Sequence, residues 1–282
     1  NVTGMNLNRF LAPGFAGFLI AVLGVDKVYY AMTGLYLVAT AFVLMMPITG
    51  KMSLRGQGTL AEVKEGLNYI KSSPVLPGLL VLTLISVLLS MPYMMLLPMF
   101  TADVITLVPN DLKWMLSLPL AGELFTPLPN LFADSAFRLG LLMTVSGIGA
   151  LVGSLMIAGM GPRRRGAVFL YSIVLTGASL LVFASSNWYF LSLLVIIPVG
   201  LGQSWRLSLS NALVQAYTSD TYRGRVMSIY MMEFGLTSFG VFGIAILSQA
   251  IGVQWAIGAT AAGLLGLGIL SLAFAHSIRS LD

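Results

Sequence analysis

Residues 168–185 read VFLYSIVLTGASLLVFAS, a run without a single charged side chain. At a rise of about 1.5 Å per residue, an α-helix needs about 20 mostly apolar residues to cross a hydrocarbon core of about 30 Å. The run therefore predicts one membrane-spanning helix. An ordinary soluble domain carries about 25% charged residues, whereas this chain carries 9% and is 57% hydrophobic. We expect an all-α, polytopic transmembrane helix bundle.

Similar apolar runs recur along the whole chain and predict about eight spans. Their approximate limits are 6–24, 28–49, 74–100, 136–160, 168–185, 188–215, 226–251 and 253–275. Lys and Arg gather after the second and fourth spans, before the seventh and after the eighth. By the positive-inside rule this side is cytoplasmic. We therefore expect a multi-pass protein of the cell (inner) membrane with both ends of the chain in the cytoplasm.

The opposite side of the predicted bundle carries a long outer loop, residues 101–135. Its charged residues are mainly acidic, namely Asp103, Asp111, Glu123 and Asp134 against Lys113. This charge difference supports the predicted orientation. The residues do not indicate a function for the loop.

A polar stretch, residues 51–73, separates the first two predicted spans from a block of six. Thr59 and Glu62 form a capping box there. Apolar residues recur at helical intervals, at Leu60, Val63, Leu67 and Ile70. This pattern predicts an amphipathic helix on the cytoplasmic membrane surface. A short soluble connector helix is the alternative.

The two-plus-six spacing indicates a domain organisation. Residues 1–50 are expected to form the last two spans of an N-terminal six-helix half, residues 51–73 a cytoplasmic linker, and residues 74–282 a complete C-terminal six-helix half. The chain begins at Asn1 without a signal peptide. We therefore expect it to be a fragment.

Composition excludes several function classes. The chain has no cysteine and a single histidine, His276, so neither a thiolate metal site nor a histidine metal cluster is expected. The formal charge of +5 does not predict nucleic-acid binding, because Lys and Arg lie between spans and not along one face. No Gly-x-x-x-x-Gly-Lys-Ser/Thr motif occurs. No cofactor is expected, and primary pumping by ATP hydrolysis is not indicated.

Four local motifs resemble those of major facilitator exporters, in the branch related to enterobactin and macrolide efflux proteins. They are APGFAG at 12–17, with Ala12 in the place of a glycine; EGLNY at 65–69; GMGPRRRG at 159–166, a basic turn without an aspartate; and RGRVMS at 223–228. The motif residues expected to matter for conformational change are Pro13, Gly14, Gly17, Arg163, Arg164, Arg165, Arg223, Gly224 and Arg225. The Arg residues also have a simpler interpretation, as topology signals and interfacial anchors.

This resemblance covers essentially the whole chain and implies a major facilitator fold, with about eight of roughly twelve spans present. It implies secondary active export of a small hydrophobic or amphipathic molecule, of drug or siderophore type, by alternating access. It further implies proton antiport as the driving force. The expected partners are thus a small-molecule substrate, protons and membrane lipids, and we expect a monomer.

Two ionisable residues lie inside predicted spans, Arg206 in the sixth and Glu233 in the seventh. Such residues are costly in a bilayer and therefore mark candidate functional sites. Both are about ten residues from the turn between these spans, which places them at a similar depth. Gln203, Arg206 and Ser210 share one helical face. We expect Arg206 to bind a substrate group and Glu233 to take up a proton, with a purely structural ion pair as the alternative.

Other residues within the spans admit two readings. Gly147, Gly149 and Gly153 in the fourth span, and Gly235, Gly240 and Gly243 in the seventh, permit either close packing or local unwinding. Packing is the favoured interpretation. The prolines Pro92, Pro98 and Pro198 are compatible with gating kinks or with static ones.

Two rival functions remain open from the sequence. An intramembrane lipid-modifying enzyme would need acid, base or metal-binding residues clustered at one depth, and the chain offers few. In a non-transporting membrane scaffold, Arg206 and Glu233 would be structural.

Overall fold

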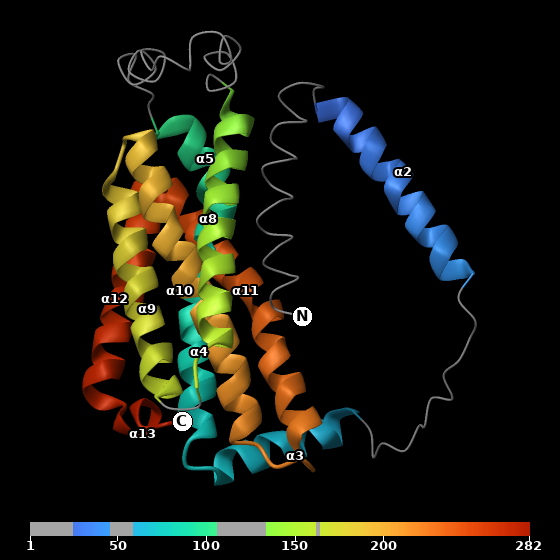
Figure 1. Cartoon of the computed structure of the whole chain (residues 1–282), viewed down its shortest axis with the longest axis vertical. Coiled ribbons are helices and arrows are strands. Elements are labelled where there is room, and N and C mark those ends of the chain that lie inside the picture. Colours follow the sequence, from blue (N-terminus) through green and yellow to red (C-terminus); the bar gives the residue numbers. More distant parts are fainter. Residues whose placement is uncertain (1–24, 46–58, 106–133, 162–163) are drawn as a thin grey trace.

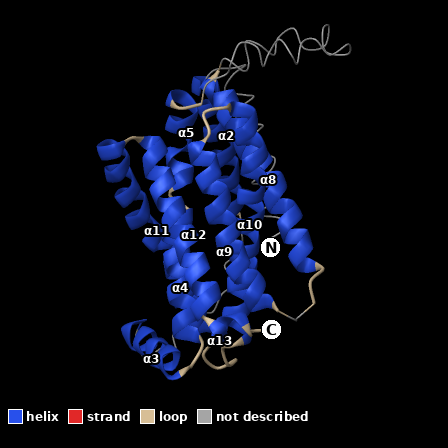
Figure 2. Cartoon of the chain, turned by 90° about the vertical axis from the view of Figure 1, so that its left-hand side faces the viewer, coloured by secondary structure: helices blue, strands red, loops and turns tan. Residues whose placement is uncertain are grey.

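A computed structural model describes residues 25–45, 59–105, 134–161 and 164–282, and every regular element in these ranges is a helix (Figure 2). The helices are α2 (Val25–Leu44), α3 (Thr59–Ser72), α4 (Leu76–Ser90), α5 (Tyr93–Asp103), α8 (Ser135–Ala158), α9 (Arg165–Ser185), α10 (Tyr189–Ala216), α11 (Arg223–Ile251), α12 (Val253–Phe274) and α13 (His276–Arg279). Within the described ranges, 7 helical segments are long and apolar enough to cross a membrane. The all-helical, multi-span architecture is confirmed. The first predicted span, 6–24, lies outside the described residues.

The helices from α4 to α12 pack side by side as one bundle, while α2 stands apart from it (Figure 1). The short helices α3 and α13 both lie at the lower end of the bundle in this view. Tight turns join successive long helices. At Gly252, φ is +87°, a conformation that glycine adopts at little cost. The same residue ends α11 and begins α12, so the chain reverses direction there within one residue.

The third predicted span, 74–100, is not one continuous helix. It is divided into α4 and α5, and Met91 and Pro92 separate the two helices. Pro92 has no backbone N–H to donate to the carbonyl of residue 88, which interrupts the helical ladder. Pro98 and Pro198, by contrast, lie inside α5 and α10. Of the three prolines named as possible kinks, Pro92 thus lies at a break, and Pro98 and Pro198 lie within continuous helices.

Small residues let α8 and α10 approach each other closely. A Cβ added to Gly149 would lie 2.0 Å from the Ile197 carbonyl oxygen, and one added to Gly200 would lie 1.9 Å from that of Ser146. Trp205 also donates a hydrogen bond to the Gly153 carbonyl, at 3.1 Å. Lipid tails are as apolar as leucine, so helices in a bilayer associate through such packing.

The glycines of α11 behave differently from one another. Gly240 lies against α4, since an added Cβ would be 2.9 Å from the Leu88 carbonyl oxygen. Added Cβ atoms on Gly235 and Gly243 would meet nothing within 4 Å among the described residues. Both α8 and α11 are unbroken. Close packing therefore accounts for Gly149, Gly153 and Gly240, and none of these glycines marks local unwinding.

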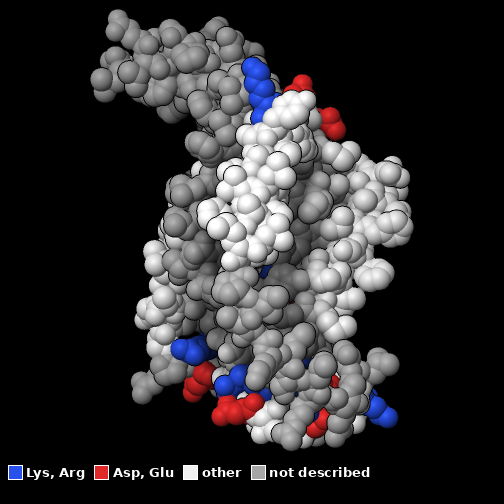
Figure 3. Space-filling view, turned by 90° about the vertical axis from the view of Figure 1, so that its right-hand side faces the viewer, with Lys and Arg blue, Asp and Glu red and all other residues white. Residues whose placement is uncertain are grey.

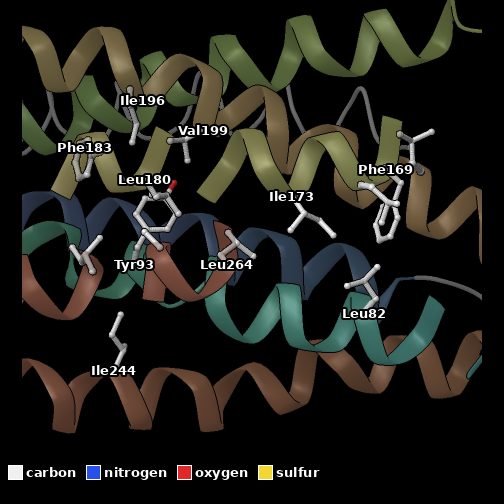
Figure 4. Close-up of a cluster of buried hydrophobic side chains, with 14 of the residues drawn as sticks. Leu82, Tyr93, Phe169, Ile173, Leu180, Phe183, Ile196, Val199, Ile244 and Leu264 are labelled. Atoms are coloured by element: carbon white, nitrogen blue, oxygen red, sulfur yellow. The ribbon is translucent and has the colours of Figure 1, made fainter. Parts of the chain in front are cut away.

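The interior of the bundle is filled by large apolar side chains from α4, α5, α9, α10, α11 and α12. Figure 4 shows part of this cluster, including Tyr93, Phe169, Phe183 and Ile196, which are at most 1% exposed. The outer surface is equally apolar, as Phe274 at 78% and Trp255 at 72% exposure illustrate. A helix bundle that is apolar both inside and outside is suited to lipid surroundings.

Exposed charged side chains of the described residues lie mainly at the ends of the molecule. On the face drawn in Figure 3, Lys, Arg, Asp and Glu gather mainly at the two extremities, and the described surface between them is almost entirely uncharged. Helices α2 and α11 contribute long apolar surfaces, with 0% and 6% of their most hydropathic windows buried. These two helices therefore offer their apolar faces to lipid or to further protein.

Replacing Gly149 with alanine should destabilise the bundle, because the added methyl group overlaps the Ile197 carbonyl. Overpacking of this kind costs about 1–3 kcal/mol. Gly235→Ala is the matched control, since its site is open and alanine favours a helix by up to about 1 kcal/mol. Thermal unfolding in detergent should show a lower Tm for Gly149→Ala only. Equal Tm values for the two variants would contradict this packing account.

Candidate functional site

The two ionisable residues of the predicted spans are buried within the bundle. Arg206 on α10 is 2% exposed and Glu233 on α11 is 6% exposed. The turn between Ala216 and Arg223 joins their helices, so each lies about 15 Å along its helix from that turn. The two side chains therefore lie at a similar height on consecutive helices.

Glu233 has a hydrogen-bond partner that the sequence did not suggest. The Thr83 hydroxyl on α4 donates to Glu233 Oε1 at 2.6 Å, and the same hydroxyl lies 2.9 Å from the Leu80 carbonyl oxygen. A hydroxyl has one proton to donate, so these two bonds are alternatives. Thr83 is 0% exposed, which makes the choice between them independent of bulk water.

A second hydrogen bond joins α10 to α11. The hydroxyls of Ser210 and Tyr230 are 2.8 Å apart and both are buried. Gln203, 2% exposed, lies on the same face of α10. We use the name buried polar cluster for the full set, which is Thr83, Gln203, Arg206, Ser210, Tyr230 and Glu233. Printed contacts join Glu233 to Thr83 and Ser210 to Tyr230, while Gln203 shares a helical face with Arg206 and Ser210. The role expected for these residues stays a prediction.

The sequence contained only a weak signal for these two residues. Tyr230 precedes Glu233 by three positions and therefore shares its helical face. Thr83 is one hydroxyl in the apolar run LPGLLVLTLISVLLS, and threonine is common in membrane helices because it can bond to its own backbone. Its role depends on the packing of α4 against α11, which one sequence does not encode locally.

The buried polar cluster can accommodate Glu233 in two protonation states. As a carboxylate, Glu233 accepts the Thr83 proton. As a carboxylic acid, it can donate to Thr83 Oγ1 while Thr83 turns to the Leu80 carbonyl, so every group keeps a partner. Among the described residues, no group of three or more His, Asp and Glu side chains is placed to hold a metal ion.

The linker motif and the α11 motif meet at the lower end of the bundle. Arg225 donates to Glu65 Oε1 at 2.9 Å, and the Arg225 guanidinium lies 5.6 Å from the Tyr222 ring centroid. Tyr222 stacks on Tyr69 with ring centroids 4.3 Å apart. We call this set of contacts the α3–α11 latch. It includes Gly66 of α3, whose added Cβ would be 3.3 Å from Arg225 Cβ.

Tyr69 also holds the turn that leads into α11. The backbone N–H of Ser219 donates to the Tyr69 hydroxyl at 3.0 Å. Hydrogen bonds from the side chain and backbone of Ser219 lower the pKa of Tyr69 below its ordinary value. The predicted helix at Thr59–Ser72 therefore exists, and it is docked on α11, with Ile70 buried and Leu67 43% exposed.

The basic turn before α9 is hydrogen-bonded to the segment that follows α12, which is distant in sequence. Arg164, with φ of +64°, donates its backbone N–H to Asp282 Oδ1 at 2.8 Å. The Gly166 N–H donates to the Leu281 carbonyl, and an added Cβ on Gly166 would lie 1.8 Å from the Ile278 carbonyl oxygen. The turn before α9 is thus bonded to the segment that follows α12.

The remaining motif residues are less informative. Arg223 pairs with Asp220 at 2.6 Å on the surface. Arg165 begins α9, and Gly224 meets nothing within 4 Å at an added Cβ. Pro13, Gly14, Gly17 and Arg163 lie outside the described residues.

Comparison with known proteins gives one family and two distant relatives. The family model of the Major Facilitator Superfamily matches residues 114–279. The multidrug efflux pump Tap of Mycolicibacterium fortuitum is 24% identical over 284 residues, which cover 98% of this chain and 62% of that protein. The Staphyloferrin A transporter of Staphylococcus aureus (strain NCTC 8325 / PS 47) is 23% identical over 257 residues, covering 88% of this chain and 56% of that protein. The chain thus spans less than two thirds of either relative's length. No solved structure matches.

Reversing the charge of Arg225 should loosen the α3–α11 latch, because Arg225→Glu places two carboxylates side by side. A partly exposed pair contributes up to about 1 kcal/mol, which corresponds to about a fivefold rise in undocked α3. Cleavage by a lysine-specific protease after Lys64 and Lys71, which are exposed on α3, should accelerate accordingly. The double variant Glu65→Arg/Arg225→Glu should restore slow cleavage, and Arg223→Glu serves as the control. Fast cleavage in the double variant would show that the ion pair does not hold α3.

Proposed function

Because the chain belongs to the Major Facilitator Superfamily, a family of membrane transporters, we propose that it is part of a proton-driven exporter of small hydrophobic or amphipathic molecules. Transport would proceed by alternating access about a site near the middle of the membrane. The buried polar cluster would be the part of that site contributed by this chain.

The observation that carries the proposal is the bonding of Glu233 to Thr83. A buried carboxylate needs a hydrogen-bonding partner or a counter-charge. Thr83 supplies a hydrogen bond at 2.6 Å and has a second acceptor within 2.9 Å. This arrangement allows Glu233 to gain and lose a proton without leaving an unsatisfied polar group. A residue with only a structural role would need one state alone.

Arg206 is proposed to couple substrate binding to the proton. Its guanidinium stabilises the charged form of Glu233 by attraction, and it can also bind an anionic or polar group of a substrate. A substrate that binds Arg206 would weaken this attraction and so change the tendency of Glu233 to bind a proton. Substrate binding and proton binding would then be coupled, each altering the other.

The remaining architecture is proposed from the spacing of the spans and from charge. Residues 1–50 would belong to an N-terminal half, residues 51–73 to the linker, and residues 74–282 to the C-terminal half. The basic side, which includes α3, would face the cytoplasm with both ends of this chain. We propose a monomer in the inner membrane.

The direction of transport rests on the relatives. One relative is named a multidrug efflux pump and the other a Staphyloferrin A transporter. Efflux of a small molecule is therefore proposed here, and we use ethidium as a probe substrate. The lipid-modifying enzyme considered from the sequence is wrong, because the family to which the chain belongs is one of transporters.

Removing the titratable proton should uncouple transport. In proteoliposomes that contain the complete transporter of which this chain is proposed to be a part, Glu233→Gln should lower ethidium transport driven by an imposed pH gradient by about tenfold or more. Exchange of ethidium at equal concentration on both sides, without a gradient, should continue, because the glutamine keeps the shape of the side chain. Gradient-driven transport at the original rate would contradict the proton role and favour a non-transporting or structural role for Glu233.

The Thr83 hydroxyl can be tested with two matched variants. Thr83→Ser keeps the hydroxyl and should retain coupling, whereas Thr83→Val keeps the shape and leaves Glu233 without its donor. We expect the pH at half-maximal gradient-driven transport to rise in Thr83→Val, because loss of a hydrogen bond to the carboxylate favours its protonated form. The measurement is transport across a series of pH values. Identical pH profiles for the two variants would show that the hydroxyl does not serve Glu233.

A further inference from the structure

A row of hydroxyl groups runs along α4 away from Glu233. Thr83, Ser86 and Ser90 are spaced by three and four residues, so they share one helical face. All three are 0% exposed. From Thr83 to Ser90 the row covers about 10 Å of the helix axis, and it leads towards the end of the bundle opposite α3. We call it the α4 hydroxyl row.

The facing side of α11 comes close to α4 beyond Glu233. Gly240 follows Glu233 by seven residues, which places both on one face of α11. An added Cβ on Gly240 would lie 2.9 Å from the Leu88 carbonyl oxygen and 3.1 Å from Pro92 Cγ. The α4–α11 contact is therefore narrow at the α4–α5 break.

The break supplies a polar end to the row. Pro92 cannot donate to the Leu88 carbonyl, and α4 ends at Ser90. The Ser90 hydroxyl is fully buried and has no hydrogen-bond partner within the described part of the chain. Buried hydroxyls in native structures nearly always bond to protein or to ordered water. Met91, beside it, is only partly buried, so the row ends close to the surface of the described bundle.

The other neighbours of Glu233 do not continue such a row. Arg206 of α10 acts on it by charge, and Tyr230 of its own helix is bonded to Ser210. On α4, by contrast, Ser86 donates to the Thr83 carbonyl at 2.8 Å and Thr83 donates to Glu233. The polar groups on α4 therefore connect Glu233 with the break.

We propose that the α4 hydroxyl row holds water molecules in line between the Met91–Pro92 break and Glu233, and that Glu233 exchanges its proton with the outer side along them. The hydroxyls are about 4.5 and 6 Å apart along the axis, too far for direct hydrogen bonds, so water bridges them. A proton enters from water at the break, each oxygen accepts one proton and releases another, and the last O–H bond forms on the Glu233 carboxylate. The proposal rests on the proton role of Glu233 given above.

Single-cysteine labelling tests the water path directly. The chain contains no cysteine, so Ser86→Cys and Ser90→Cys each introduce one thiol. Ser172→Cys is the matched control, because the Ser172 hydroxyl is also fully buried but bonds to the Phe169 carbonyl of its own helix α9. The probe is Ag⁺, which travels through narrow water-filled paths and binds thiolates. Protection of the thiol from later maleimide labelling in denaturant is the readout.

We expect Ag⁺ to reach Ser90→Cys from the outer side of right-side-out membrane vesicles at least about tenfold faster than Ser172→Cys. Ser86→Cys should react more slowly than Ser90→Cys, because it lies further along the path. In inside-out vesicles, where Ag⁺ is added to the inner side, Ser86→Cys should no longer react more slowly than Ser90→Cys. Equal protection rates for Ser90→Cys and Ser172→Cys, or faster reaction of Ser90→Cys from the inner side, would overturn the proposal.

A functional measurement separates this proposal from the one on which it rests. Ser90→Ala should slow pH-gradient-driven proton movement, followed with a trapped pH dye, by several-fold, and Ser90→Thr should restore it. If Glu233→Gln loses coupling but Ser90→Cys does not react with Ag⁺, the proton role of Glu233 stands and the proposed water path is overturned. If Ser90→Cys reacts but Glu233→Gln keeps its coupling, the water path stands and its use by Glu233 is overturned.

Discussion

The close contact between α8 and α10 at Gly149 and Gly200 determines where the buried polar cluster lies. In lipid, two apolar helices gain little by hiding leucines from their surroundings, so backbone approach and shape set their relative position. Neither glycine tolerates a Cβ, because the facing carbonyl oxygens lie about where it would be built. The contact fixes α10, and α10 then presents Arg206 and Ser210 towards α11 at a defined height. A looser contact would leave this height undetermined.

Burial of Arg206 and Glu233 is costly, and the structure offsets the cost in a specific way. An apolar pair would give a more stable interface in most settings, so the polar residues need another explanation. Tyr230, Ser210 and Thr83 surround them with hydroxyls that are neutral and able both to donate and to accept. Such partners stabilise either protonation state of a carboxylate, whereas an arginine in direct contact would favour one. The composition of the cluster thus fits a residue that changes charge.

Most of the fold could be predicted from the sequence, because a bilayer requires helices of fixed length and apolar composition. The predicted limits 168–185 and 253–275 differ from α9 and α12 by at most three residues. Pro92 was named as a possible kink, but hydropathy did not show that the helix is divided there, because Met91 and Pro92 do not interrupt the apolar run. Thr83 was missed because its significance lies in a contact with a residue 150 positions away. Local patterns identify spans, and long-range packing decides which polar groups meet.

Two polar segments, the linker helix α3 and the segment after α12, contact turns at the lower end of the bundle. The α3–α11 latch holds α11 at Arg225, two helical turns from Glu233, and Tyr69 accepts a hydrogen bond from the preceding turn. The segment after α12 holds the α9 turn through Asp282 and approaches Tyr217, whose hydroxyl is 3.4 Å from the Asp282 nitrogen. A helix transmits a rigid displacement along its axis, because its backbone bonds are internal. Movement of the α3–α11 latch would therefore shift Glu233 relative to Thr83. The position of α3 at the lower end of the bundle is thus linked to the hydrogen bond between Thr83 and Glu233.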